Sequence, residues 1–128
     1  MSELKRVLYV EDEPDIRAVA ELALGAVGGF ELCTCESGEQ AVREAVAFAP
    51  DLMILDVMMP GMDGPSTLRA LRAMPEMAGV PAIFMTAKVQ PEEVKQLLAL
   101  GALEVIPKPF DPMTLAQRVM TVWERRDS

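Results

Sequence analysis

The stretch Asp51-Leu52-Met53-Ile54-Leu55-Asp56 places four consecutive apolar residues between two acids. The run is too short for an ordinary helix, and it lacks the polar alternation of a strand with one wet face. Continuous apolar runs are typical of parallel sheets that helices cover on both faces. We therefore interpret residues 51–55 as a buried strand of such a sheet, with Asp56 directly after its end.

Four other short runs rich in apolar residues lie at intervals along the chain. They span residues 6–10, 30–35, 81–85 and 103–106. Each is too short for a helix and is interpreted as a further strand. Glu104 interrupts the last run, which indicates that this strand lies near an edge of the sheet.

The segments between these runs have apolar residues at spacings of three and four, which predicts helices. Pro14 suits the first turn of a helix that stops before Gly28. Ser37 and Gln40 have the spacing of a capping box, and the helix they open is expected to stop before Pro50. Each of these two helices follows a strand.

Later segments continue the same pattern. One helix is expected at residues 91–100, and another begins at Pro112 with Asp111 as its N-cap. Five strand–helix units in succession predict one α/β domain over residues 1–128, built as a doubly wound five-stranded parallel sheet with helices on both faces.

The 128 residues carry a net charge of −8 and include no histidine. An acidic chain repels the phosphates of nucleic acid, so we expect no direct nucleic-acid partner. Without histidine, the chain has neither a Ser-His-Asp nor a Cys-His catalytic set, and no phosphohistidine of its own. Because no run of eighteen apolar residues and no signal-peptide core occurs, we expect a cytoplasmic protein without a membrane partner.

Cys33 and Cys35 are the only two cysteines, and they lie two residues apart in an expected strand. A rise of about 6.6 Å between them exceeds the separation that a disulfide bridges, so we predict free thiols. A metal site is disfavoured because the chain offers no second cysteine pair and no histidine. We interpret both as small, half-buried strand residues.

Polar residues stand at the ends of four expected strands. Glu11 and Asp12 follow the first strand, Asp56 the third, Thr86 the fourth and Lys108 the fifth. Because ligands of open α/β sheets gather at the carboxyl ends of the strands, we expect these side chains to meet at one edge. Each alone suits a turn or a solvated surface, but three acids with a lysine and a hydroxyl suit Mg2+ and a phosphoryl group. This set predicts that Asp56 attacks phosphorus while Mg2+ and Lys108 neutralise the phosphoryl oxygens.

Four short motifs surround these residues. They are Val10-Glu11-Asp12-Glu13-Pro14, Leu55-Asp56-Val57-Met58-Met59-Pro60-Gly61-Met62-Asp63-Gly64, Met85-Thr86-Ala87 and Lys108-Pro109-Phe110. Their order and spacing resemble those of the receiver (chemotaxis-type) domains of two-component response regulators, over essentially all 128 residues. The resemblance implies a flavodoxin-like fold with strand order 2-1-3-4-5 and five helices.

The resemblance also implies roles for individual residues. Asp56 matches the phosphoacceptor, while Lys108 matches the residue that pairs with the phosphoryl group. Thr86 matches the hydroxyl that turns inward to that group, and the bond between Lys108 and Pro109 is expected to be cis. The implied Mg2+ ligands are Asp12 and Asp56 directly, Glu11 through water, and Met58 through its backbone carbonyl.

Some positions depart from the usual receiver pattern. Receivers usually have Tyr or Phe where this chain has Val105, so the switch keeps the hydroxyl of Thr86 without its aromatic companion. Met58 and Lys88 occupy positions that tune phosphate loss in the family, and we hypothesise a phosphorylated-state lifetime different from that of other receivers. Trp123 is either a core residue of the last helix or a contact residue of the surface that receivers use for dimerisation and output, and we favour the contact role.

The resemblance implies a signalling switch. A sensor histidine kinase or a histidine phosphotransfer protein is expected to donate a phosphoryl group to Asp56. The surface formed by the fourth helix, the fifth strand and the fifth helix is then expected to change for a downstream protein target or a second copy of the chain. The chain is expected to be no metabolic enzyme and to catalyse only its own phosphorylation and dephosphorylation. We expect no output domain on it, so it either acts alone or is a piece of a longer protein.

Three alternatives fit the sequence less well. A phosphatase or phosphotransferase acting on small substrates commonly has a second Asp two residues after the nucleophile, where this chain has Met58. A flavin or dinucleotide carrier requires a Gly-rich loop after the first strand, where Glu11 and Asp12 stand instead. A degenerate receiver used only for binding is disfavoured by the intact Asp56, Thr86 and Lys108.

Overall fold

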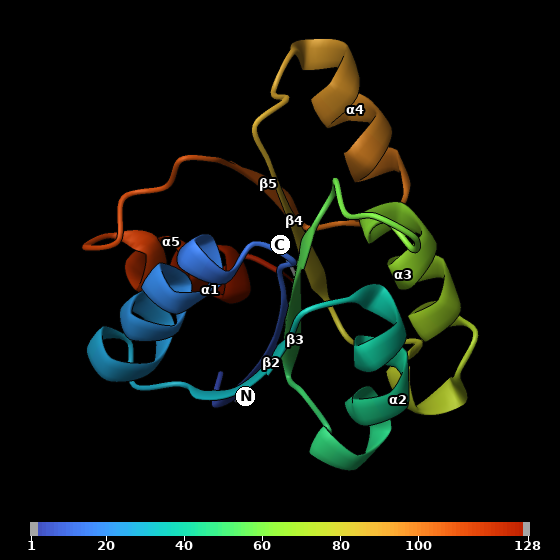
Figure 1. The fold of residues 1–128 in the computed structure, drawn as a ribbon, viewed down its shortest axis with the longest axis horizontal. Helices are drawn as coiled ribbons and strands as arrows, with labels where there is room; N and C mark the ends of the chain where they lie inside the picture. Colours follow the sequence, from blue (N-terminus) through green and yellow to red (C-terminus); the bar gives the residue numbers. More distant parts are fainter. Residues whose placement is uncertain (1–2, 127–128) are drawn as a thin grey trace.

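The computed structural model describes residues 3–126, in which strands and helices alternate along the chain (Figure 1). The strands are β1 (Arg6–Val10), β2 (Glu31–Cys35), β3 (Leu52–Asp56), β4 (Ala82–Thr86) and β5 (Glu104–Pro107). The helices are α1 (Pro14–Glu21), α2 (Gly38–Phe48), α3 (Gly64–Arg72), α4 (Pro91–Ala99) and α5 (Leu115–Glu124). A π-helical segment, η1 (Leu22–Val27), continues α1, and a 3-10 turn, η2 (Pro75–Met77), follows α3. The five predicted strands are confirmed.

The five strands form one parallel sheet in the order β2-β1-β3-β4-β5. This order confirms the flavodoxin-like, doubly wound architecture. Every residue of β3 and β4 is buried, which explains why their sequences are almost continuously apolar. β5 lies at one edge of the sheet, as Glu104 indicated, and β2 lies at the other.

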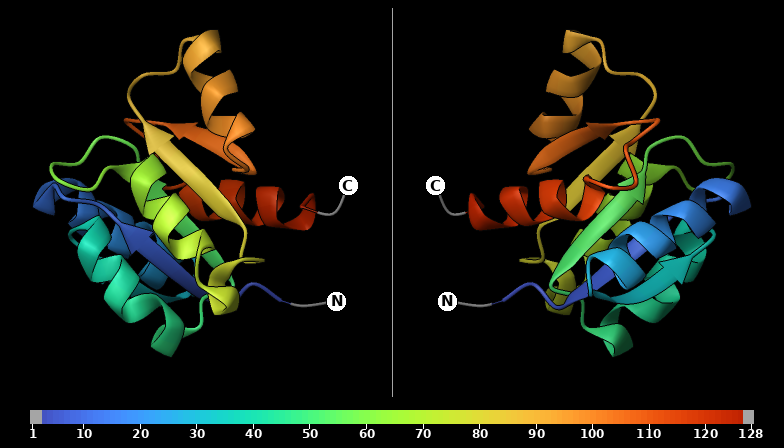
Figure 2. Two further views of the ribbon diagram at one scale, coloured as in Figure 1. Left: turned by 90° about the vertical axis from the view of Figure 1, so that its right-hand side faces the viewer. Right: turned by 90° about the vertical axis from the view of Figure 1, so that its left-hand side faces the viewer.

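Two layers of helices cover the sheet (Figures 1 and 2). α1 and α5 lie on one face, where Leu24 of η1 and Val119 of α5 pack in the same core cluster as Tyr9 of β1. α2, α3 and α4 lie on the other face, where Leu68 and Leu97 pack in a second cluster. Each strand therefore sends alternate side chains into two separate cores.

The capping prediction for α2 is confirmed. The Oγ atom of Ser37 accepts the backbone N–H of Gln40 at 3.1 Å, and the side chain of Gln40 accepts the N–H of Glu36 at 2.9 Å. The first bond satisfies an N–H group that the first turn of a helix leaves without a partner, and the second holds the residue before the N-cap.

Two helix predictions need correction. The first helix does extend to Val27, but its last six residues are π-helical, which the spacing of apolar residues did not reveal. The last helix begins at Leu115 and not at Pro112, because Oδ1 of Asp111 accepts the N–H of Met113 at 2.9 Å and stabilises a turn before the helix.

Trp123 is a core residue, so the contact role that we favoured is wrong. Its side chain is 6% exposed and packs in the cluster under α5. The guanidinium of Arg126 lies 3.6 Å from the centre of the indole ring. In residues 3–126, no helix is both long enough and apolar enough to cross a membrane.

Candidate functional site

The predicted site residues meet where the winding of the sheet reverses. β1 has β2 on one side and β3 on the other, and the helices that follow β1 and β3 cover opposite faces. This arrangement leaves a crevice at the carboxyl ends of the strands. Glu11 and Asp12 follow β1, Asp56 ends β3, Thr86 ends β4 and Lys108 follows β5. All five residues lie at this one edge.

Lys108 joins two of the acids. Its Nζ atom lies 2.8 Å from Oδ1 of Asp56 and 3.2 Å from Oε1 of Glu11. The side chain of Glu11 is fully buried and that of Lys108 is 13% exposed, so water screens these ion pairs less than it screens surface pairs. The peptide bond between Lys108 and Pro109 is cis.

The close charges shift the pKa values of this cluster. Burial, together with the charge of Asp56, raises the pKa of Glu11 to about 7. Burial also raises the pKa of Asp56, although Lys108 opposes this shift. Burial lowers the pKa of Lys108, but the hydrogen bonds and charges of Asp56 and Glu11 outweigh that effect and raise it. Burial is the largest cause of both carboxyl shifts, and the nearby charge of Lys108 offsets it only in part.

Asp12 provides a carboxylate oxygen without a partner. One oxygen each from Glu11, Asp12 and Asp56 lies within 4.8 Å of the others, and Oδ1 of Asp12 is buried without a hydrogen bond. Both oxygens of Glu11 are engaged, one by Lys108 and one by the N–H of Glu13 at 3.3 Å. Mg2+ prefers carboxylate oxygens and retains several waters. The cluster therefore fits a hard divalent cation such as Mg2+.

A pocket of about 410 Å3 opens beside the acids and is lined by Asp56, Met58, Thr86 and Lys108, among others. Met58 is 58% exposed. Thr86 is buried, and its hydroxyl oxygen accepts the N–H of Lys88 at 3.0 Å. The hydroxyl is thus held by the loop after β4.

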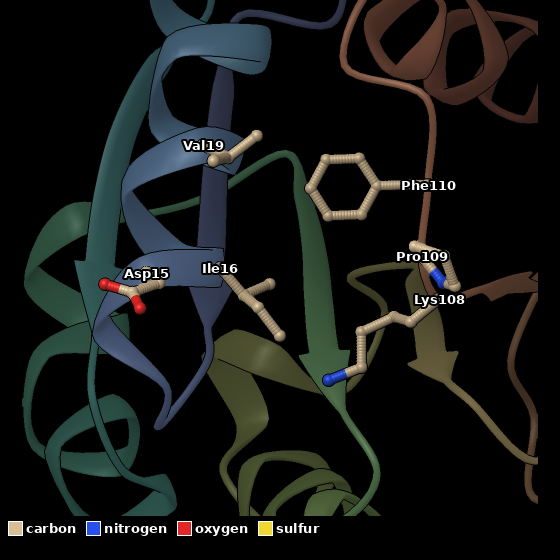
Figure 3. Close-up of a pocket in the computed structure, with 6 residues that line it drawn as sticks. All are labelled: Asp15, Ile16, Val19, Lys108, Pro109 and Phe110. Atoms are coloured by element: carbon tan, nitrogen blue, oxygen red, sulfur yellow. The ribbon is translucent and has the colours of Figure 1, made fainter.

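A second, apolar pocket of about 250 Å3 lies between α1 and the segment after β5 (Figure 3). Ile16 and Val19 of α1 face Phe110 across it, and the amine of Lys108 extends toward the end of β3. Ile16, Lys108 and Pro109 line both pockets. A molecule bound in the apolar pocket would therefore lie next to the acids.

Two residues to which the sequence assigned no role also position the site. Arg17 donates a hydrogen bond from Nη1 to the backbone carbonyl of Glu11 at 2.7 Å. Gly64, at the start of α3, donates its N–H to the carbonyl of Val57 at 2.9 Å. A methyl group on Gly64 would overlap the carbonyl of Asp56 and lie 2.8 Å from Cα of Val57. No spacing pattern in a sequence reveals such a close approach of two backbone segments.

An acid cluster, a hydroxyl and a lysine at the reversal point of a doubly wound sheet define the receiver class of signalling domains. The family model described as the response regulator receiver domain matches residues 7–120. The chain belongs to this family, in which phosphorylation and Mg2+ binding are typical.

Relatives and solved structures agree with this assignment. The DNA-binding response regulator MtrA of Mycolicibacterium smegmatis is 35% identical over 123 residues, and the transcriptional regulatory protein PrrA of Mycobacterium tuberculosis is 37% identical over 123 residues. Each match covers 96% of this chain and 52% of the relative, so the chain spans about half the length of these proteins. The chemotaxis protein CheY4 of Vibrio cholerae superposes with a TM-score of 0.86 at 31% identity, covering 94% of this chain and 99% of CheY4. From the net charge we expected no nucleic-acid partner. The relative MtrA is described as DNA-binding, so the comparison does not support that expectation.

Replacing Gly64 with alanine should displace the end of β3 and weaken Mg2+ binding. We expect the Mg2+ concentration needed for half-maximal thermal stabilisation to rise about tenfold or more, because residues that orient metal ligands typically contribute that much to metal affinity. Thermal unfolding measured over a series of Mg2+ concentrations gives this value.

Gly38→Ala is the matched control, because a methyl there meets the side chains of Thr67 and Met62 between α2 and α3. It should lower stability by about 1–3 kcal/mol through overpacking, with an unchanged Mg2+ requirement. Equal Mg2+ requirements for the two variants would show that Gly64 does not position the site.

Proposed function

We propose that the protein is a phosphoaccepting switch in which Asp56 receives a phosphoryl group from a phosphohistidine of a partner. The observation that carries this proposal is the position of Lys108, which lines the pocket and whose amine pairs with both Asp56 and Glu11. A cation beside a buried carboxylate stabilises the charge of that nucleophile and also the charge of the phosphoryl group that the nucleophile attacks. The partner is a sensor histidine kinase or a histidine phosphotransfer protein.

In the transfer step, a carboxylate oxygen of Asp56 forms a bond to phosphorus. The bond between phosphorus and the partner's imidazole nitrogen breaks, and the imidazole keeps the electron pair and takes up a proton. Before transfer, the amine of Lys108 lies 2.8 Å from the carboxylate of Asp56. It is therefore close enough to pair with a phosphoryl oxygen when the carboxylate becomes an acyl phosphate. Removal of water from this partly enclosed site strengthens that pairing.

The proposed metal site completes the charge balance. Mg2+ held by Asp12, Asp56 and the backbone carbonyl of Met58, with Glu11 acting through water, would neutralise charge on the phosphoryl oxygens. Asp12 suits the direct bond because its Oδ1 atom is buried and has no hydrogen bond.

We propose that the apolar pocket between α1 and Phe110 receives the phosphoryl donor. It shares Lys108 with the pocket at Asp56, so a partner seated there would hold its phosphohistidine beside the acceptor. We expect such a partner, like this chain, in the cytoplasm.

Thr86 would transmit the change. To contact a phosphoryl group, its hydroxyl must leave the N–H of Lys88 and thereby move the loop that leads to α4. Val105 of β5 is buried. Its side chain has no ring, so it cannot make the inward movement of the Tyr or Phe that receivers usually have at this position. We propose that the signal passes mainly through this loop to the surface of α4, β5 and α5, where Leu98 and Leu100 are exposed. A downstream protein or a second copy of the chain would bind that surface.

Incubation with acetyl phosphate tests the acceptor role. The wild type should gain one phosphoryl group in a mass spectrum when Mg2+ is present, and none in a chelator. Asp56→Ala should gain none, because Asp56 is the acid of the cluster that lines the pocket, while both oxygens of Glu11 are already engaged by Lys108 and the N–H of Glu13. Exposed acids are not activated in this way.

Glu92→Gln, a change at an exposed acid of α4, is the control and should label like the wild type. An unlabelled wild type, or a phosphoryl group that survives Asp56→Ala, would contradict the proposal.

The lifetime of the phosphorylated state tests the roles of Met58 and Lys88. Both residues line a small pocket with Thr86, close to where water must approach Asp56. Met58→Asn introduces a polar group that can orient water and should speed phosphate loss several-fold. Lys88→Glu replaces a cation with an acid and should also change the rate. Loss of the phosphoryl group is followed by mass after acetyl phosphate is removed, and rates equal to the wild type in both variants would refute this hypothesis.

A further inference from the structure

A second group of metal-binding side chains lies away from the acids, between β2 and α2. Cys33 and Cys35 stand on the face of β2 that α2 covers, and Glu44 lies on that helix. One ligand atom from each of these three residues lies within 4.8 Å of the other two. The sequence disfavoured a metal here because it offered no second cysteine pair and no histidine. The fold supplies Glu44 as the third ligand.

The spacing of these atoms suits a tetrahedral centre. The Sγ atom of Cys33 lies 3.5 Å from Oε1 of Glu44. With Zn–S bonds of about 2.3 Å and Zn–O bonds of about 2.1 Å, a tetrahedral zinc ion separates such a sulfur and oxygen by about 3.6 Å. These two ligand atoms therefore already have the separation that a zinc ion requires.

The carboxylate of Glu44 is also oriented by a hydrogen bond to the oxygen that does not face Cys33. Its Oε2 atom accepts the side-chain N–H of Gln40 at 2.8 Å, which leaves Oε1 directed at Cys33. Metal ligands in proteins are typically held by such outer hydrogen bonds. Gln40 is itself positioned at the start of α2, where its backbone N–H bonds to Ser37.

We propose that Cys33, Cys35 and Glu44 form a site for a thiophilic divalent cation of the Zn2+ class, with water as the fourth ligand. Cys35 is fully buried, whereas Cys33 and Glu44 are half-buried and leave a route from solvent. Binding converts both thiols to thiolates, so two protons leave for each cation bound. Thiolate ligands favour Zn2+ over Mg2+, which separates this site chemically from the acids at the end of β3.

Cation binding here would link an edge strand to a helix. β2 pairs with a neighbouring strand on one side only, and the two thiols would be joined through the metal to Glu44 on α2. The bound state should therefore unfold at a higher temperature. The alternative is a thiol that only donates a hydrogen bond to Glu44.

Cobalt binding distinguishes a metal site from a thiol that only donates a hydrogen bond to Glu44. The reduced full chain is titrated with Co2+ in excess Mg2+, which occupies the acid cluster. We expect one Co2+ per chain, sulfur-to-cobalt charge-transfer bands, the visible bands of tetrahedral cobalt, and displacement by Zn2+. Zn2+ should also raise the unfolding temperature under the same conditions.

Variants identify the ligands. Cys33→Ser should lose the charge-transfer bands or reduce them strongly, and Glu44→Gln should weaken Co2+ binding about tenfold or more, since a direct ligand contributes at least as much as an outer one. Glu39→Gln, at an exposed acid of the same helix, should bind like the wild type. The proposal is overturned by a wild type without charge-transfer bands, by bands of undiminished intensity in Cys33→Ser, or by equal binding in Glu44→Gln and Glu39→Gln.

Discussion

The ion pair between Lys108 and Asp56 is the interaction on which the site depends. It joins the ends of β3 and β5, two strands that are not neighbours in the sheet, across the end of β4. It also supplies a cation to a cluster that otherwise contains three acids. Burial raises the carboxyl pKa values of Glu11 and Asp56 even with Lys108 in place. Positive charge from Mg2+ would offset this cost of burying the acids, and the amine of Lys108 could then bind a phosphoryl group.

The fold creates this cluster by bringing distant segments to one edge. Glu11 and Lys108 are separated by 97 positions in the sequence yet lie 3.2 Å apart. Their approach follows from the parallel sheet, because all strands end at the same edge, and from the reversal of winding between β1 and β3. Gly64 allows α3 to start against the backbone of Asp56, so the nucleophile and the helix after it are held together.

Much of this arrangement could be predicted from the sequence, because the strands are short apolar runs and the site residues directly follow or end them. Asp56, Thr86 and Lys108 lie at the predicted edge for that reason. Features that depend on three-dimensional packing could not be predicted. The approach of Glu44 to Cys33 is a contact between two elements, which periodicity and local spacing do not encode. The spacing of apolar residues also did not reveal the π-helical hydrogen bonding of Leu22–Val27 or decide between the core and the surface for Trp123.

A double-mutant cycle on Lys108 and Asp56 tests the central interaction most directly. The free energy of unfolding is measured by urea denaturation in a chelator for the wild type, Lys108→Met, Asp56→Asn and the double variant. Lys108→Met should cost more in the wild type than in the Asp56→Asn background, with a coupling energy of about 0.5–3 kcal/mol, as expected for residues in direct contact. Equal costs in the two backgrounds would contradict the account, because the lysine would then not stabilise the acid at the end of β3.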